Sequence, residues 1–124
     1  MPINQVTYQG KKVITISYED FQSKELMIDS AKRLADYILS QPEGHIRVFI
    51  DLTEALGSRE FMAASKAARM RVYKEKTTTS AAIGVTGMKK VLLKGYNAIS
   101  KTKGIVPFDT KEKALEYLVN DGKD

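Results

Sequence analysis

The chain has no cysteine and only one histidine among its 124 residues. Without cysteine there can be no disulfide bond, iron–sulfur cluster, thiolate zinc site or thiol nucleophile. No apolar run approaches the roughly 20 residues that a membrane-spanning helix needs. The opening segment, Met1-Pro2-Ile3-Asn4-Gln5, also lacks the basic-then-apolar order of a secretion signal. We therefore expect a cytoplasmic protein.

Residue patterns that support catalysis are also absent from the sequence. It contains no Ser/His/Asp arrangement, no Glu-x-x-His motif and no spacing typical of metal ligands. His45 stands beside Gly44 in a predicted turn, and we expect it to be structural because acid–base or metal chemistry needs converging partners. We expect no catalytic residue, no metal site and no cofactor, and we do not expect an enzyme.

Positive charge is concentrated in one part of the chain. Ten cations and one acid, Glu75, lie between Met62 and Phe108, so this span carries +9 and leaves −4 for the rest of a chain whose net charge is +5. The cations are Lys66, Arg69, Arg71, Lys74, Lys76, Lys89, Lys90, Lys94, Lys101 and Lys103. Such a distribution indicates an anionic partner for this region.

The length predicts one domain over residues 1–124. Its first part is typical of a β-hairpin followed by a helix. Gln5–Tyr8 and Lys12–Tyr18 have strand character, and Gly10 between them can supply a positive φ. A helix is predicted from about Lys24 to Gln41, with Ser23 as its N-cap. Its inward stripe would contain Met27, Ala31, Leu34, Ala35, Ile38 and Leu39.

Strands and helices then alternate. Ile46–Leu52 is nearly all apolar, as expected of a parallel strand that is covered on both faces. A helix from Ser58 to about Lys76, a strand at Ala81–Val85 and a helix from about Met88 to Ser100 follow. The chain closes with a short strand at Ile105–Phe108 and a helix that ends near Leu118, where Asp109 and Glu112 have the spacing of a capping box.

This order predicts an α/β fold with right-handed crossovers. We expect a mixed, mostly parallel sheet of about five strands, with an antiparallel first strand and four main helices.

The last third of the chain resembles the small bacterial STAS-like (SpoIIAA-like) domains. The residues that carry the resemblance are the strand Ala81–Val85, the segment Thr86-Gly87-Met88-Lys89-Lys90 and the segment Phe108-Asp109-Thr110 before the final helix. In those domains this half has a strand, Gly-x-x-Gly-hydrophobic-Lys-Lys, a helix, Phe-Asp-Thr and a last helix. The resemblance implies a SpoIIAA-like βα superhelix and a regulatory or interaction role.

Within that superfamily, anti-sigma-factor antagonists carry a phosphorylatable serine in an Asp-Ser-Ser-Gly motif. The equivalent stretch here, residues 51–59, lacks the motif but contains Thr53 and Ser58, which are the candidates for modification.

A first candidate site lies at the turn after the Ala81–Val85 strand. Backbone N–H groups, the Thr86 hydroxyl and the ammonium groups of Lys89 and Lys90 around Gly87 could hold a phosphate or carboxylate. Asp51 ends a strand where α/β proteins place ligand groups. The alternative is structural: Gly84 permits close helix–sheet packing, Gly87 shapes the turn and Asp51 belongs to a turn.

A second candidate site is a basic face shared by two helices. Its predicted members are Lys66, Arg69, Tyr73, Lys76, Lys90, Lys94 and Lys101. Lysine with interleaved tyrosine suits an acidic protein surface or a phosphate backbone, and a solvated helix face is the alternative.

We therefore predict a non-enzymatic interaction or regulatory module that binds an acidic protein partner. The alternatives are a carrier of a small anionic or lipid-like ligand near Asp51 and Gly87, and nucleic-acid binding through the basic face. The sequence leaves homodimer formation open.

Overall fold

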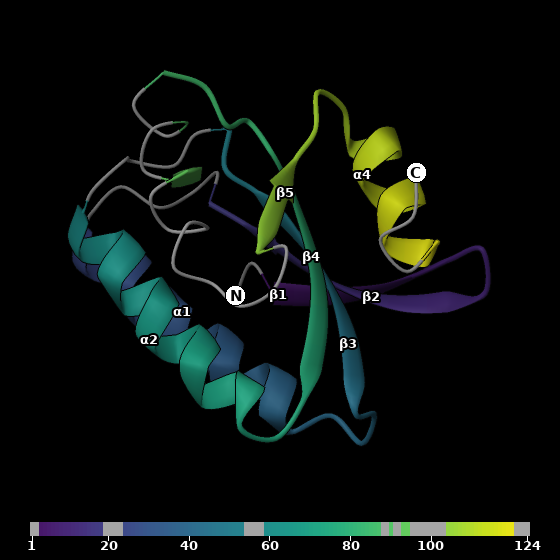
Figure 1. The fold of residues 1–124 in the computed structure, drawn as a ribbon, viewed down its shortest axis with the longest axis horizontal. Helices are drawn as coiled ribbons and strands as arrows, with labels where there is room; N and C mark the ends of the chain where they lie inside the picture. The colour runs from purple at the N-terminus through teal and green to yellow at the C-terminus, as the bar shows by residue number, and fades with distance from the viewer. Residues whose placement is uncertain are drawn as a thin grey trace.

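The computed structural model describes residues 3–18, 24–53, 59–87, 90, 93–94 and 104–120 (Figure 1). Within these ranges the chain forms five strands and three helices. In chain order they are β1 (Ile3–Tyr8), β2 (Lys11–Ser17), α1 (Lys24–Leu39), β3 (His45–Asp51), α2 (Arg59–Tyr73), β4 (Thr77–Ile83), β5 (Ile105–Pro107) and α4 (Lys111–Val119). Apart from Lys90, Leu93 and Lys94, the helix expected at Met88–Ser100 lies outside the described residues, and so does the expected N-cap Ser23.

The strands form a single mixed sheet in the order β1-β2-β3-β4-β5. β1 is antiparallel to β2, and each later strand is parallel to the one before it. The expected α/β class, the five strands and the antiparallel first strand are confirmed. Because every parallel step joins neighbouring strands, the chain advances across the sheet in one direction.

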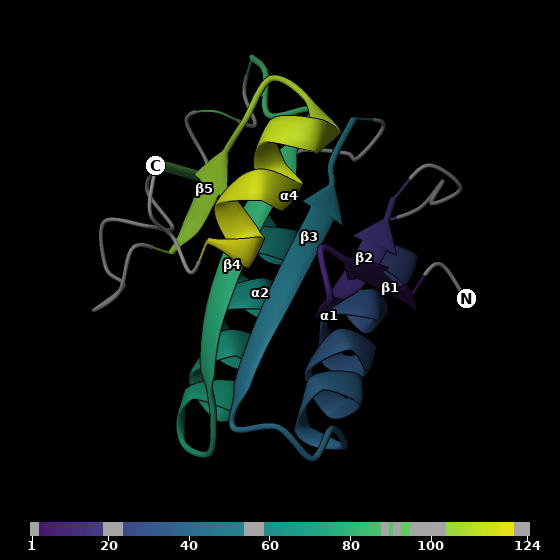
Figure 2. The same ribbon diagram turned by 90° about the vertical axis from the view of Figure 1, so that its right-hand side faces the viewer.

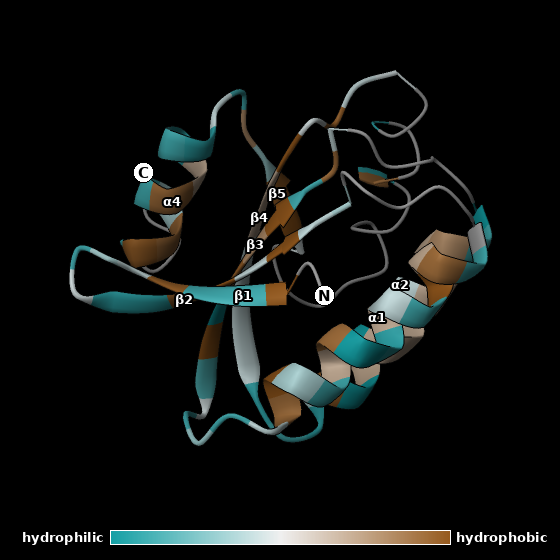
Figure 3. Ribbon diagram, turned by 180° about the vertical axis from the view of Figure 1, so that it is seen from behind, coloured by the Kyte–Doolittle hydropathy of each residue, from teal (hydrophilic) through white to brown (hydrophobic). Residues whose placement is uncertain are grey.

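Helices cover both faces of the sheet. α1 and α2 lie side by side on one face, and α4 lies on the other (Figures 1 and 2). Alternate residues along a strand pack against the helices on opposite faces of the sheet. Ile14 and Val48 belong to the core on the α1 and α2 side, whereas Phe49 belongs to the core on the α4 side. The apolar residues of β3, β4 and β5 meet between the layers (Figure 3). This arrangement explains why Ile46, Val48, Phe49 and Ile50 of β3 are all buried, although they alternate between the two faces.

The apolar stripe of α1 is confirmed by its burial. Met27, Ala31, Ala35 and Ile38 are each at most 5 % exposed. α1 ends at Leu39, shortly before Pro42, because proline disfavours helical geometry in the residue that precedes it. α2 buries Phe61 and Val72.

The predicted start of β4 was wrong. The strand begins at Thr77, not at Ala81, and ends at Ile83. Thr77, Thr78 and Thr79 pair with the first residues of β3. The predicted bounds left these threonines in the connection before the strand. Threonine is β-branched and suits a pleated surface, so they extend the strand instead.

The predicted cap of the last helix was also wrong, by one residue. Thr110, with φ −134° and ψ 153°, is the N-cap of α4, and its side chain accepts a hydrogen bond from the Lys113 backbone N–H at 3.2 Å. Asp109 precedes this cap, so it cannot form the expected capping box with Glu112. None of the described helices has the length and apolar character needed to cross a membrane.

Candidate functional site

Asp51 lies at the end of β3 and stabilises the turn that follows it. Its Oδ1 accepts a hydrogen bond from the Thr53 backbone N–H at 2.9 Å. The Leu52 N–H donates to the Ile83 carbonyl at 3.0 Å, which holds the same turn against the end of β4. This geometry is that of a turn aspartate, the structural alternative considered above.

Gly84 allows the two loops that leave β3 and β4 to approach each other closely. Its φ is +76°, and a Cβ built on it would overlap the backbone N and Cα of Thr53 and lie 2.7 Å from the Thr53 Oγ1. The sequence interpretation assigned Gly84 to helix–sheet packing. In the structure the close contact joins two loops, a long-range approach that no local pattern predicts.

Gly87 shapes the turn that follows. Its φ is +56°, and its carbonyl accepts from the Lys90 N–H at 3.0 Å. Thr86, Gly87 and Lys90 are exposed, whereas Lys89 lies outside the described residues. An anion at this end of the sheet could use Thr86 and Lys90, but one placed beside Asp51 would meet a carboxylate.

Arg69 and Tyr73 of the expected basic face interact with each other. The Arg69 Nε–H donates to the Tyr73 hydroxyl, and the guanidinium carbon lies 5.2 Å from the centre of the Tyr73 ring. A second guanidinium nitrogen of Arg69 lies 3.5 Å from the Oγ of Ser80 in β4. Both residues are half-buried, so this cation lies against the sheet.

Lys76 interacts with the loop between α1 and β3. Its ammonium group donates to the carbonyl of Gln41 at 2.6 Å and to the carbonyl of Glu43. Lys76 follows the end of α2 rather than continuing it. Its contacts attach the chain after α2 to the loop after α1, a role that helical periodicity had not indicated.

Three cations of the expected face are exposed. Lys66 projects from α2, and Lys90 and Lys94 lie on either side of the buried residue Leu93. Among the described residues these three lysines form no ion pair; the ion pairs found there are Lys12–Glu43, Arg33–Asp29 and Arg71–Asp36. We call Lys66, Lys90 and Lys94 the basic face. Lys101 lies outside the described residues.

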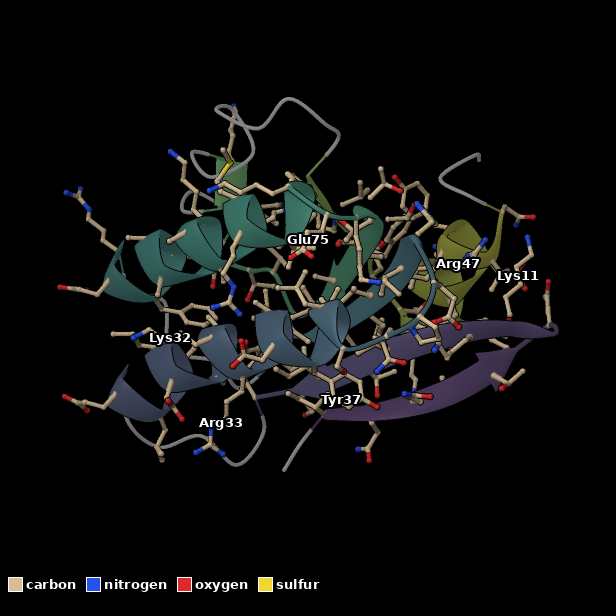
Figure 4. All side chains as sticks on the ribbon, turned by 90° about the horizontal axis from the view of Figure 1, so that it is seen from below. Lys11, Lys32, Arg33, Tyr37, Arg47 and Glu75 are labelled. Atoms are coloured by element: carbon tan, nitrogen blue, oxygen red, sulfur yellow. The ribbon has the colours of Figure 1, made fainter. Side chains whose placement is uncertain are left out.

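Two cations that sequence reasoning missed stabilise the C-terminal end of α4. The Arg47 Nε–H donates to the Leu118 carbonyl at 3.0 Å, and the Lys11 ammonium donates to the Val119 carbonyl at 2.8 Å. Figure 4 shows both side chains beside this end of the helix. The last carbonyls of a helix lack intrahelical partners and carry partial negative charge, so cations stabilise them.

The single histidine is part of β3, not of the turn predicted before it. The two ring nitrogens of His45 lie 2.7 Å from the Thr77 Oγ1 and 2.9 Å from the Thr79 Oγ1. His45 therefore links the first residues of β3 to β4. Among the described residues no group of three or more His, Asp or Glu side chains could hold a metal ion.

α4 borders a surface hollow of about 570 Å³ on the side of the sheet opposite α2. Its lining residues are Phe108, Thr110, Glu112, Lys113, Glu116, Tyr117 and Asn120. Glu116 accepts hydrogen bonds from the Tyr8 hydroxyl at 2.9 Å and from the Gln9 amide at 2.8 Å. The Glu116 carboxylate raises the pKa of Tyr8 above its ordinary value of 10.0, chiefly through that hydrogen bond.

No family model matches this chain, and a search of curated proteins finds no match either.

Proposed function

We propose that this protein is a non-enzymatic interaction or regulatory module of STAS-like type that binds an acidic protein surface. The observation that carries the proposal is the basic face: Lys66, Lys90 and Lys94 are exposed and form no ion pair among the described residues. Like charges on one protein repel one another, and an anionic partner relieves that repulsion.

The STAS-like part of the proposal is supported by the sheet. An antiparallel first strand followed by parallel strands in sequential order is the arrangement expected of a βα superhelix. The fourth helix stays a prediction. So does modification at Thr53, which is exposed, and at Ser58, which lies outside the described residues.

A protein surface fits the basic face better than a small anion or a nucleic acid does. None of the three lysines lines the hollow beside α4. Tyr73, the aromatic residue expected to interleave with the cations, has Arg69 over its ring, so that ring face is not open to a stacking base. Dispersed, exposed cations suit a broad acidic surface.

The test is the affinity for a fluorescently labelled polyglutamate peptide, measured by anisotropy. The test variant is Lys66→Glu/Lys94→Glu, and the control is Lys32→Glu/Lys113→Glu. Both change the net charge by the same amount, and all four substituted lysines are exposed. We expect the first variant to lose roughly tenfold or more in affinity and the control to lose much less. Binding of the unchanged protein should weaken from 0.1 M to 1 M salt, where the Debye length falls from about 10 Å to about 3 Å.

Inorganic phosphate and a single-stranded oligonucleotide of equal charge serve as competitors. Equal losses in the two variants would show that only net charge matters and would contradict the proposal. Tighter binding of phosphate, or of the oligonucleotide, would favour the carrier or the nucleic-acid alternative.

A further inference from the structure

β1 forms one end of the sheet, and within the described residues no other strand pairs with its outer edge. Its four central residues, Asn4–Thr7, are exposed. An open edge presents unpaired N–H and C=O groups, and proteins usually protect it with lysine, proline or a β-bulge. β1 has none of these: it carries no charge and no proline, and it pairs with β2 without interruption from Ile3 to Tyr8.

The other end of the sheet is protected. β5 has only three residues, Ile105–Pro107, and the last of them is a proline. A short edge strand and a residue without an N–H donor both limit pairing with another chain. The contrast makes β1 the edge that is suited to accept an additional strand.

The hairpin geometry identifies the backbone groups that are available. Gln9 and Gly10 form a two-residue turn with φ of 50° and 79°, so the flanking residues Tyr8 and Lys11 form a hydrogen-bonded pair. Such pairs alternate along an antiparallel ladder. The backbone groups of Ile3, Gln5 and Thr7 therefore point away from β2.

The position of Asn4 agrees with this alternation. Its carbonyl accepts from the Thr15 hydroxyl at 3.5 Å, so this carbonyl points toward β2.

We propose that the β1 edge binds β1 of a second copy of this chain, antiparallel, with a two-fold axis at Gln5. In this register Ile3 of one copy lies opposite Thr7 of the other, and Gln5 lies opposite Gln5. The outward-pointing backbone groups of these three residues all form hydrogen-bonded pairs. Asn4 lies opposite Val6. Within the paired strands no like charges meet, because β1 is uncharged.

The charge distribution favours a second copy at this edge over any other contact between copies. All ten cations of the +9 span, residues 62–108, lie on the connections from β3 to β4 and from β4 to β5, whereas β1 is at the opposite end of the sheet from β5. Joining the two β1 edges places these spans at opposite ends of one continuous sheet. Their separation then exceeds the Debye length of about 8 Å at physiological salt, so their repulsion is screened.

The adjacent flank of α1 adds apolar surface to the contact, together with Arg33, which pairs with Asp29 at 2.7 Å. The Gln5 amide donates to the Tyr37 hydroxyl at 2.5 Å, so Tyr37 marks the side of α1 nearest β1 (Figure 4). Leu26 lies eleven residues, or three helical turns, earlier on the same flank and is 51 % exposed. The α1 flanks of the two copies would face each other across the axis.

Sedimentation equilibrium of the full chain over a range of concentrations tests the proposal. We expect a monomer–dimer equilibrium. Gln5→Lys places two cations opposite each other and should raise the dimer dissociation constant at least about tenfold. Ala63→Lys adds the same charge on the exposed side of α2 and should leave the constant nearly unchanged.

Single cysteines in this cysteine-free chain test the register independently. Asn4 and Val6 would face each other in a non-hydrogen-bonded pair, where Cα atoms are about 4.5 Å apart and a disulfide can form. Mixed Asn4→Cys and Val6→Cys chains should therefore oxidise to a linked dimer far more than either variant alone. A protein that stays monomeric at every concentration, equal effects of the two lysine variants, or no excess linkage in the mixture would overturn the proposal.

Discussion

Gly84 and Thr53 are in such close contact that no side chain fits between them. A Cβ on Gly84 would overlap the Thr53 backbone, whereas a Cβ on Gly87 would have no atom within 4 Å. Both glycines have positive φ, so both resist substitution through backbone strain. The pair separates the effect of steric overlap from the effect of backbone strain within one loop.

We expect Gly84→Ala to destabilise the protein by roughly 2–5 kcal/mol, because overpacking adds to the strain of the left-handed conformation. Gly87→Ala should cost about 1–2 kcal/mol, from strain alone. Urea unfolding followed by linear extrapolation measures both free energies. Similar losses in the two variants would mean that the β3 and β4 loops separate easily.

Arg47 provides a second test, of the packing of α4. Arg47→Met keeps an apolar stem but removes the donor to the Leu118 carbonyl and the charge at the helix end. We expect a loss of about 1–2 kcal/mol in the free energy of unfolding. Lys113→Met, on the exposed side of the same helix, should change it by less than about 0.5 kcal/mol. Indistinguishable effects would show that the Arg47 contact does not stabilise α4.

The hydrogen bond between Tyr8 and Glu116 predicts a pH dependence at the alkaline end. The folded-state pKa of Tyr8 is raised, so its stabilising contribution is complete below the ordinary pKa of 10.0 and is lost as pH rises through the folded value. The stability difference between the unchanged protein and Tyr8→Phe should therefore be constant from pH 7 to 9 and shrink above pH 10.

Glu116→Gln supplies the control for this measurement. It removes the carboxylate that raises the pKa of Tyr8, so in its background Tyr8→Phe should show a smaller alkaline change. The same pH profile with and without Glu116 would contradict the assignment.

The local patterns of the sequence were sufficient to predict most elements. The α1 stripe at Met27, Ala31 and Ile38 and the apolar run of β3 follow from helical periodicity and two-sided burial. Errors occurred where two signals competed. Thr77–Thr79 could be a loop or a strand, and pairing with β3 decided for the strand.

The candidate site was less predictable, because its geometry depends on long-range contacts. Helical spacing grouped Arg69 and Lys76 with Lys66, yet Arg69 lies against Ser80 and Lys76 contacts the carbonyls after α1. The loop contact of Gly84 and the link from Arg47 to α4 likewise join residues far apart in sequence. Such contacts leave no periodic signal.

The most direct test of the proposed function is to locate polyglutamate binding residue by residue. Titrating the ¹⁵N-labelled protein with the peptide and following its backbone amide signals does this, with α4 as the internal reference. We expect the largest shifts at Lys90, at Lys94 and in α2 around Lys66, shifts that disappear at 1 M salt, and little change in α4. Largest shifts in α4, or equal shifts over the whole chain, would contradict a basic face built on these lysines.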